Sequence, residues 1–202
     1  IKNKSIVCLV TARSGSLGLK NKNIKKIKNK PLLSYPITAS LKSKYVNTTY
    51  LSTDSKYYAK IGKMFGAKIA FLRPKKISTS KSTSFQAIRH FLDFLKKEKK
   101  KYHILLLLEP TSPLTTSKDI DAALKYFLNR YDSSDGLVTI GELDKFDKNS
   151  IFNLKNNYIK YSKSLKKELN ISRQNKKKYF FLDGSLYIGK INKILKNSGF
   201  IS

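Results

Sequence analysis

Acidic side chains are scarce in this sequence of 202 residues. Thirteen Asp and Glu residues stand against 42 Lys and Arg, which leaves a formal net charge of +29. Such an excess raises the question of nucleic-acid binding. The lysines, however, are spread over the whole chain, and Asn and Ile are abundant too, a bias typical of AT-rich genomes. We favour compositional drift over nucleic-acid binding and keep the second interpretation as an alternative.

Cysteine and long apolar runs are also nearly absent. The single cysteine, Cys8, excludes an internal disulfide and favours a reducing compartment, so we expect a cytoplasmic protein. The longest purely aliphatic run covers residues 104–108. A membrane-spanning helix needs about 20 apolar residues, so we expect no membrane span.

Arginine is rare in a chain so rich in lysine. Where drift favours Lys, an Arg side chain is expected to do a geometric task that Lys does not do, such as binding a phosphate or carboxylate through two parallel hydrogen bonds. The five positions are Arg13, Arg73, Arg89, Arg130 and Arg173. Arg89 and Arg130 fall on predicted helix surfaces, so we expect them to be solvated.

Near-continuous apolar strands alternate with amphipathic helices along the chain. The pattern predicts strands at 5–11, 47–53, 67–72, 102–108, 136–140 and 183–189. It predicts helices at 30–44, 55–65, 84–97 and 118–129, the last capped by Ser117, and a short helix after residue 189. Such alternation is typical of an α/β fold with a doubly wound, mostly parallel sheet.

The pattern weakens between residues 142 and 180. Short polar and aromatic pieces replace the alternation there, which we interpret as a hairpin or arm. No flexible linker or internal repeat separates it from the rest. We therefore expect residues 1–202 to form a single domain, with 142–180 as an arm for dimerisation or substrate contact.

Three chemically distinctive stretches follow predicted strands. They cover residues 11–23, 73–84 and 109–115. In doubly wound folds, ligands bind outside the carboxyl ends of the strands. We therefore expect these stretches to meet in one site.

The first of these stretches, "TARSGSLGLKNKN", combines small residues with positive charge. Small residues leave backbone N–H groups accessible, so such a turn can bind an anion, and Arg13 with Lys20 or Lys22 adds charge. The loop does not fit the GxxxxGK[ST] pattern, and "GSLG" lacks the first Gly of GxGxxG. It therefore predicts a polyphosphate site that is neither a Walker loop nor a dinucleotide fingerprint.

"ARSGSLGLKNKN" resembles the signature loop of the CMP-N-acylneuraminate synthetases, the cytidylyltransferases that activate sialic acid and related sugar acids. Further matches follow in the family's order: "LSTDS" at 51–55, "FLRP" at 71–74, "LLEPTSPLTT" at 107–116, "SRQ" at 172–174 and "DGSLYI" at 183–188. The resemblance implies a Rossmann-like nucleotidyltransferase fold with a projecting dimerisation region. It also implies CTP and Mg²⁺ as substrate and cofactor, and a homodimer.

The resemblance also implies site residues, position by position. The nucleotide side would comprise Arg13, Ser14, Gly15, Ser16, Gly18, Lys22, Asn23, Arg73, Ser82 and Ser84. The sugar side would comprise Glu109, Thr111, Ser112, Arg173, Gln174, Asp183 and Tyr187. Lys22 and Arg13 are the expected catalytic cations, which neutralise charge as a sugar-acid hydroxyl attacks the α-phosphorus of CTP and pyrophosphate leaves.

Several positions depart from the family pattern. Leu17 replaces the usual Lys, Glu109 replaces Gln, and Thr115 replaces Arg. Near the last motif, Phe181 replaces the usual Arg and Asp183 replaces the usual Asn. A sialic, legionaminic or pseudaminic type of 2-keto acid is therefore open as substrate. Another sugar nucleotidyltransferase, or an inactive or nucleic-acid-binding basic protein, remains an alternative.

The resemblance also bears on the metal. Family members hold Mg²⁺ with an Asp-x-Asp pair that follows a further strand, and no such pair follows Asp183. We therefore expect the pair to lie beyond Ser202, the chain to be a C-terminally shortened fragment, and its activity with Mg²⁺ to be low.

Overall fold

The computed structural model describes residues 4–16, 18–142, 153–155, 158–160 and 180–200 of the chain. The chain divides into two compact units. The first comprises Ile1–Thr139 with Gly184–Ser202, and the second comprises Ile140–Asp183. The expected arm at 142–180 falls within the second unit, and most of it lies outside the described residues.

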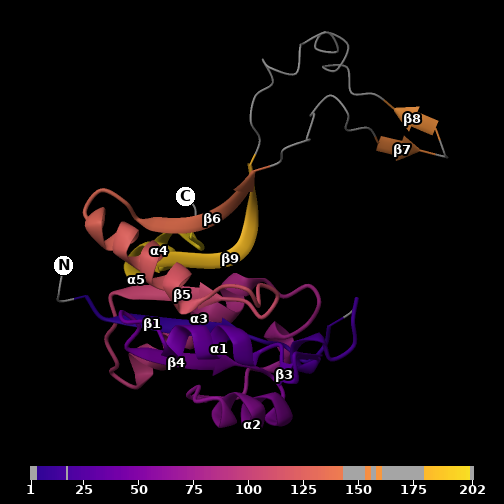
Figure 1. Cartoon of the computed structure of the whole chain (residues 1–202), viewed down its shortest axis with the longest axis horizontal. Coiled ribbons are helices and arrows are strands. Elements are labelled where there is room, and N and C mark those ends of the chain that lie inside the picture. The colour runs from indigo at the N-terminus through magenta and orange to yellow at the C-terminus, as the bar shows by residue number, and fades with distance from the viewer. Residues whose placement is uncertain (1–3, 17, 143–152, 156–157, 161–179, 201–202) are drawn as a thin grey trace. The chain divides into compact units, whose positions relative to one another are not determined.

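A five-stranded sheet forms the centre of the first unit, with the order β4-β1-β5-β9-β6 (Figure 1). Its strands are β1 (Ile6–Thr11), β4 (Thr48–Ser52), β5 (Ile104–Leu108), β6 (Gly136–Glu142) and β9 (Phe180–Lys190). Strand β1 pairs in parallel with both β4 and β5, while β9 is antiparallel to β5. The expected mostly parallel α/β sheet is confirmed.

Strand β6 lies at the edge of the sheet, beside β9. Asp135 O accepts a hydrogen bond from Lys190 N, and Thr139 is hydrogen-bonded to Leu186. Because one residue number rises as the other falls, β6 runs antiparallel to β9 and therefore parallel to β5.

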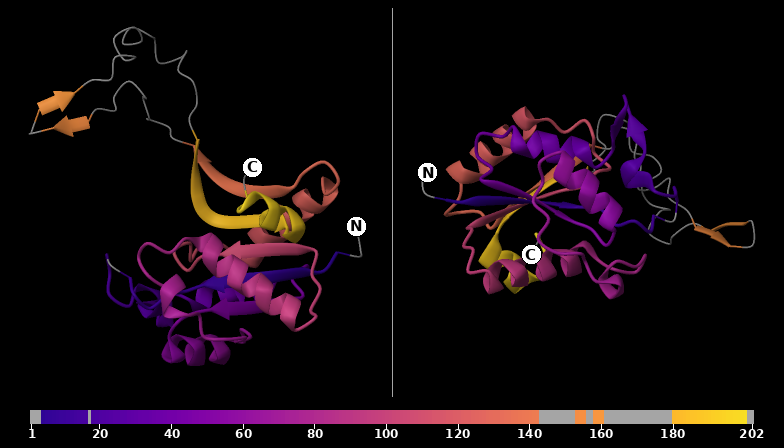
Figure 2. Two further views of the ribbon diagram at one scale, coloured as in Figure 1. Left: turned by 180° about the vertical axis from the view of Figure 1, so that it is seen from behind. Right: turned by 90° about the horizontal axis from the view of Figure 1, so that it is seen from below.

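Helices cover both faces of this sheet, as the right-hand view of Figure 2 shows. They are α1 (Ser34–Leu41), α2 (Lys56–Met64), α3 (Ser84–Lys97), α4 (Ser117–Asn129) and α5 (Ile191–Asn197). There are also two short 3₁₀ helices among the described elements. The first, η1 (Lys22–Ile24), follows β1, and the second, η2 (Lys75–Ile77), precedes α3. Two small hairpins complete the described elements: β2 (Lys26–Ile27) with β3 (Lys30–Pro31), and β7 (Asn153–Lys155) with β8 (Tyr158–Lys160).

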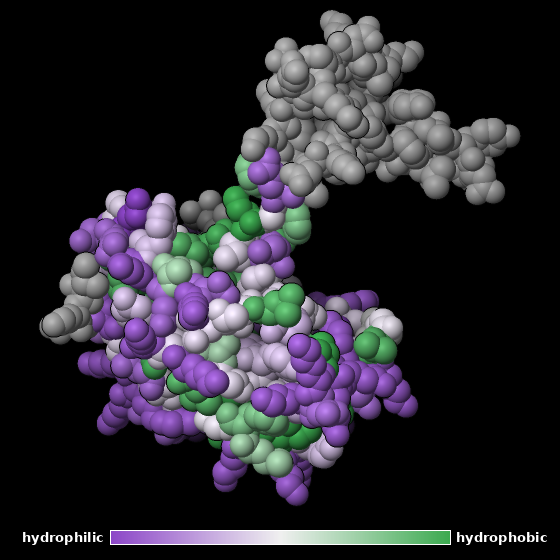
Figure 3. Space-filling model, in the orientation of Figure 1, coloured by the Kyte–Doolittle hydropathy of each residue, from purple (hydrophilic) through white to green (hydrophobic). Residues whose placement is uncertain are grey.

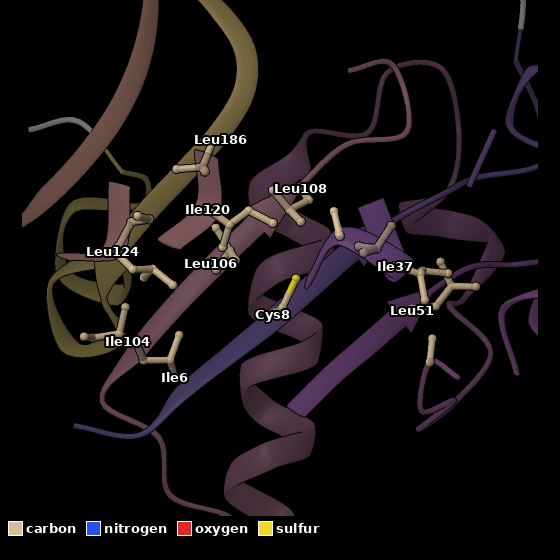
Figure 4. Close-up of a cluster of buried hydrophobic side chains, with 14 of the residues drawn as sticks. Ile6, Cys8, Ile37, Leu51, Ile104, Leu106, Leu108, Ile120, Leu124 and Leu186 are labelled. Atoms are coloured by element: carbon tan, nitrogen blue, oxygen red, sulfur yellow. The ribbon is translucent and has the colours of Figure 1, made fainter. Parts of the chain in front are cut away.

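The core has two layers because successive side chains of β1 point to opposite faces of the sheet. Ile6, Cys8 and Val10 join one cluster with residues of α1 and α4 (Figure 4). Val7 and Leu9 join the other cluster with residues of α3 and α5. All five side chains are at most 1% exposed, so β1 is buried on both faces, as its continuous apolar sequence predicts.

Two predicted elements are wrong in extent or kind. The helix expected at 30–44 begins only at Ser34, because Lys28 and Asn29 adopt positive φ and turn the chain into the β2–β3 hairpin. The strand expected at 67–72 makes only two isolated bridges, at Lys68 and Leu72. Between those bridges, Ala70 and Phe71 pack against the core cluster that includes α3.

The cap expected for α4 is displaced by one residue. Thr116 is the N-cap and Ser117 is the first helical residue. Thr116 accepts a hydrogen bond from Asp119 N, and the Asp119 side chain bonds back to Thr116 N. This reciprocal capping box needs the residue three positions before Asp119, which is Thr116.

Lysine contributes mainly to the surface. Among the described residues, Arg73 is the only charged side chain that is buried. Hydrophilic residues cover most of the visible face of the first unit, and hydrophobic ones gather there in small groups (Figure 3). None of the helices in the described part of the chain has the length and apolar character needed to span a bilayer.

Candidate active site

A cleft of about 470 Å³ opens beside the carboxyl ends of β1 and β5. Its described lining comes from the three stretches singled out in the sequence: the loop after β1, the segment before α3 and the residues after β5. The lining residues are Thr11, Arg13, Ser16, Gly18, Leu19, Lys22, Asn23, Arg73, Ile77, Ser82, Thr83, Ser84, Glu109, Pro110 and Thr111. Parallel strands end at one edge of the sheet, which explains why segments almost 100 residues apart meet here.

The loop after β1 is fixed from inside the protein. Asn23 is 5% exposed, and its side-chain amide donates a 2.9 Å hydrogen bond to the backbone carbonyl of Arg13. The guanidinium of Arg13 in turn donates to Gly15 O across 2.6 Å. The half-buried Lys22 follows in η1 and faces the same cleft. The loop therefore presents two cations to the cleft, one of them from a backbone carbonyl position held by Asn23.

Arg73 lines the cleft although its side chain is largely buried. It is 6% exposed, and its Nε donates to Ser78 Oγ across 3.1 Å. Burial lowers the pKa of the guanidinium, the nearby Asp54 acts in the opposite direction, and the nearby Arg13 lowers it further. A buried cation is stabilised by an anionic partner, so this side chain is suited to bind an anionic ligand in the cleft.

The N-terminus of α3 forms the next part of the wall. Thr83 is its N-cap, with the capping box completed by Gln86. The Ser84 hydroxyl lies 3.4 Å from Oε1 of Glu109, which follows β5. This wall combines hydroxyl groups, the positive end of a helix and one carboxylate.

Ten of the predicted site residues line this cleft: Arg13, Ser16, Gly18, Lys22, Asn23, Arg73, Ser82, Ser84, Glu109 and Thr111. Four others in the first unit are not brought into its lining: Ser14, Gly15, Ser112 and Tyr187. The Tyr187 ring lies 5.5 Å from that of Phe200. Asp183 belongs to the second unit, and Leu17, Arg173 and Gln174 lie outside the described residues.

Several residues at the cleft were not predicted from the sequence. Thr11, Leu19, Ile77, Thr83 and Pro110 line it without having been predicted. Thr83 carried a usable signal, since "TSFQ" has the spacing of a capping box at the start of a helix. The motif "LSTDS" predicted no role for Asp54, yet both its carboxylate oxygens accept hydrogen bonds from Ser14.

The structure leaves the expected magnesium site untested. The described residues contain no group of three or more His, Cys, Asp or Glu side chains that could hold a metal ion. Mg²⁺ at phosphate sites is usually bound by one or two carboxylates together with substrate phosphates. Glu109 is the one carboxylate in the described lining of the cleft, so the expected Mg²⁺ stays a prediction and we derive no step through it.

Comparison with known proteins decides the family. A family model described as "Cytidylyltransferase" matches residues 7–186. The chain belongs to the cytidylyltransferase family. This confirms the family expected from the motifs, and the match includes every segment that lines the cleft.

Two curated relatives illustrate the similarity. An N-acylneuraminate cytidylyltransferase of Escherichia coli is 36% identical over 79% of this chain and 38% of its own length. A protein of Helicobacter pylori, named pseudaminic acid cytidylyltransferase and UDP-2,4-diacetamido-2,4,6-trideoxy-beta-L-altropyranose hydrolase, is 32% identical over 91% of this chain and 34% of its own length. The chain thus spans little more than a third of the length of these relatives.

The fold is also shared with a solved structure, that of CMP:2-keto-3-deoxy-manno-octonic acid synthetase complexed with CTP. The TM-score is 0.69 at 16% identity, over 96% of this chain and 77% of that one. At this identity the likeness concerns the fold alone, and it agrees with the expected nucleotidyltransferase architecture.

Proposed function

We propose that this cytidylyltransferase-family chain uses CTP to activate a 2-keto sugar acid of the sialic, legionaminic or pseudaminic type. The observation that carries the proposal is the convergence of Arg13, Lys22 and Arg73 on one cleft at the carboxyl end of the sheet. A polyphosphate brings several negative charges, and three cations that line one cleft match them. The names of the relatives supply the sugar class.

The reaction is transfer of a cytidylyl group. A hydroxyl oxygen of the sugar acid forms a bond to the α-phosphorus of CTP, and the bond from that phosphorus to the bridging oxygen breaks. The products are a CMP-sugar, pyrophosphate and the proton from the hydroxyl. Lys22 and Arg13 would stabilise the negative charge that develops on the phosphate oxygens. Arg73, which also lines the cleft, would hold the nucleotide from its buried position.

Glu109 is our candidate for the sugar side of the cleft, together with Thr111. Both follow β5 and line the same cleft as Lys22. A carboxylate repels the carboxylate of a sugar acid and attracts an amino or amide group. Glu109 would therefore favour a nitrogen-bearing substituent on the sugar. Arg173, Gln174 and Asp183 stay predicted partners of the sugar, as does Tyr187.

The test is incubation of the protein with CTP and a panel of 2-keto sugar acids, with pyrophosphate release and CMP-sugar formation as readouts. Parallel reactions with ATP, GTP and UTP measure the selectivity for the base. We expect product with CTP and at least one nine-carbon acid. Product with another nucleotide and a neutral sugar, or salt-sensitive binding of single-stranded nucleic acid without CTP binding, would favour the alternative functions.

Homodimerisation is a further part of the proposal. In the second unit, Ile140, Phe180, Phe181 and Leu182 are each between 47% and 54% exposed. A group of large apolar side chains with that exposure favours contact with another protein surface, and a second copy is the simplest partner. Light scattering coupled to size exclusion measures the mass directly.

Cytoplasmic location and the requirement for Mg²⁺, which added EDTA would test, also stay predictions.

A further inference from the structure

The end of strand β4 connects to both arginine-bearing walls of the cleft. Ser52 O accepts a 3.0 Å hydrogen bond from the backbone N–H of Ala12, directly before Arg13. Thr53 O accepts a 2.8 Å hydrogen bond from the backbone N–H of Arg73. Ser52 and Thr53 are fully buried. The backbone of β4 thus sets where each arginine leaves the core.

Asp54 directly follows Thr53 and binds the loop after β1 through its carboxylate. Oδ1 accepts from the backbone N–H of Ser14 across 2.8 Å, and Oδ2 accepts from the Ser14 hydroxyl across 2.7 Å. The two residues lie 40 positions apart in the chain. Hydrogen bonds to an ionised carboxylate are about twice as strong as neutral ones, so this pair is a firm attachment of the loop.

The attachment acts on one particular peptide. The N–H that Asp54 binds and the carbonyl that Asn23 binds belong to the same peptide unit, between Arg13 and Ser14. With its oxygen and its N–H both held, that peptide plane has little freedom to rotate. The direction in which the Arg13 side chain leaves the backbone is fixed with it.

Charge alone does not explain a carboxylate at this place. Asp54 lies close enough to Arg73 to act on its pKa, beside a cleft that we propose to bind a polyanion. An anionic group so placed opposes the binding of phosphates. Any favourable effect of Asp54 on nucleotide binding must therefore come through geometry.

We propose that Asp54 is a positioning residue for the cytidylyl transfer: by binding both donors of Ser14 it fixes the Arg13–Ser14 peptide and so directs Arg13 into the cleft. The inference rests on the proposed function. It also accounts for Ser14, which lies outside the lining of the cleft because both its donors face Asp54. Asp54 touches neither substrate in this role and acts through the loop.

An effect of Asp54 through its charge and an effect through the geometry of the loop would change the affinity for CTP in opposite directions. Removal of a nearby negative charge would by itself strengthen CTP binding. Loss of the attachment would weaken it, because the loop would pay conformational entropy on binding that the native protein has already lost. Asp54→Ala and Asp54→Asn therefore separate geometry from charge.

The chain offers a matched control in Asp121 of α4. Its Oδ1 accepts from the Ser43 hydroxyl across 2.6 Å and from the backbone N–H of Lys44 across 3.0 Å. The chemistry is the same Asp-to-Ser attachment of a loop, but none of these residues lines the cleft. Asp121→Ala therefore reports what such an attachment contributes to folding stability alone.

The experiment measures the Kd for CTP by calorimetry, kcat and KM with the best sugar acid, and Tm. For Asp54→Ala we expect the Kd for CTP to rise about tenfold or more, as for loss of a charge-assisted hydrogen bond. Asp121→Ala should lower Tm and leave the Kd unchanged. Asp54→Asn keeps one carbonyl acceptor, so its Kd should lie between those of the wild type and Asp54→Ala.

A double mutant tests whether Asp54 acts through Ser14. Ser14→Ala should weaken CTP binding less than Asp54→Ala, and the combined variant should bind like Asp54→Ala alone, because both changes remove the same contact. Unchanged or tighter CTP binding by both Asp54 variants would overturn the proposal, as would an equal loss in Asp121→Ala. If the wild type itself fails to bind CTP, the proposed function fails as well, which distinguishes the two outcomes.

Discussion

The side-chain amide of Asn23 and the backbone carbonyl of Arg13 are joined by a hydrogen bond of 2.9 Å. Asn23 is nearly buried and also accepts a 2.8 Å hydrogen bond at its backbone oxygen from Leu33 N. It therefore ties the loop to the chain that enters α1. Asn23→Ala should reduce the free energy of unfolding by about 1–3 kcal/mol, the usual effect of leaving a buried polar group unpaired, and raise the KM for CTP.

Asn47 provides the control for Asn23. Its Oδ1 accepts a 2.6 Å hydrogen bond from the backbone N–H of Ile6, at the other end of β1. Asn47→Ala should destabilise the protein in urea without changing the KM for CTP. The same change of KM in both variants would mean that the nucleotide responds to the general stability of β1 and not to the loop.

Lys22 and Lys20 are the two candidates for the catalytic lysine of the loop after β1. Lys22 lines the cleft and is half-buried, whereas Lys20 is exposed and absent from its lining. If Lys22 stabilises charge in the transition state, Lys22→Ala should lower kcat by roughly 10²-fold. Lys20→Ala should have a much smaller effect. Steady-state kinetics with saturating CTP measures both, and a larger loss at Lys20 would contradict the assignment.

Glu109 is predicted to select among sugar acids. Glu109→Gln keeps an oxygen for the Ser84 hydroxyl, which lies 3.4 Å away, so the change removes charge with little change of shape. We expect kcat/KM to shift between sugar acids with and without a nitrogen-bearing substituent, while the KM for CTP stays nearly constant. A change confined to the KM for CTP would place Glu109 on the nucleotide instead.

The strands and their shared edge could be predicted because the signals are local. Continuous apolar runs such as 104–108 specify strands buried on both faces, and helices between them specify parallel pairing. From that topology the meeting of the stretches around Arg13 and Glu109 follows directly, since both follow strands that the structure confirms. The strand expected at 67–72 is wrong because this segment makes only two isolated bridges, while its apolar residues pack against both core clusters. Local pattern does not separate such a segment from a regular strand.

The fixing of the loop could not be predicted in the same way. Asp54 and Ser14 are 40 residues apart, and their contact depends on the register between β1 and β4, in which Thr11 pairs with Ser52. Sequence pattern sets which strands are neighbours more readily than their register. The same limit explains why Ser14 was predicted to bind the nucleotide although its donors face Asp54.

The cap of α4 gives a test in the unfolding equilibrium. Thr116→Ala removes the N-cap acceptor for Asp119 N and should cost about 1 kcal/mol. Ser117→Ala should change stability little, because Ser117 is the first helical residue. The bonds from Thr116 also lower the pKa of Asp119. A lowered pKa stabilises the folded state above the ordinary value of 3.8, so this contribution should fade as the pH falls below it.

Urea denaturation of both variants at neutral and acidic pH measures the two effects together. The difference between Thr116→Ala and the wild type should shrink in acid, since protonated Asp119 accepts only weaker, neutral hydrogen bonds from Thr116 in the wild type. Equal losses in the two variants at neutral pH would contradict the assignment of Thr116 as the cap.

Cys8 is predicted to be chemically inert in the folded protein. Its side chain is fully buried on β1, between Thr49 of β4 and Leu106 of β5. Burial raises the pKa of the thiol to about 12, and a hydrogen bond with Ser40 offsets this only in part. Because the thiolate is the reactive form, an aromatic disulfide reagent should not modify the native protein near neutral pH and should modify it fully in denaturant.

The same burial predicts how stability changes in alkali. The folded protein keeps the proton of Cys8 up to a pKa of about 12, whereas the unfolded chain releases it near the ordinary value of 9.0. Unfolding in this window therefore releases a proton, so the free energy of unfolding should fall as the pH rises, by roughly 1.4 kcal/mol per pH unit from this group. Cys8→Ala lowers stability at neutral pH by leaving a small cavity, but it has no thiol to ionise. Its stability should fall less steeply than that of the wild type above about pH 9, and equal slopes in urea titrations would show that Cys8 does not carry this dependence.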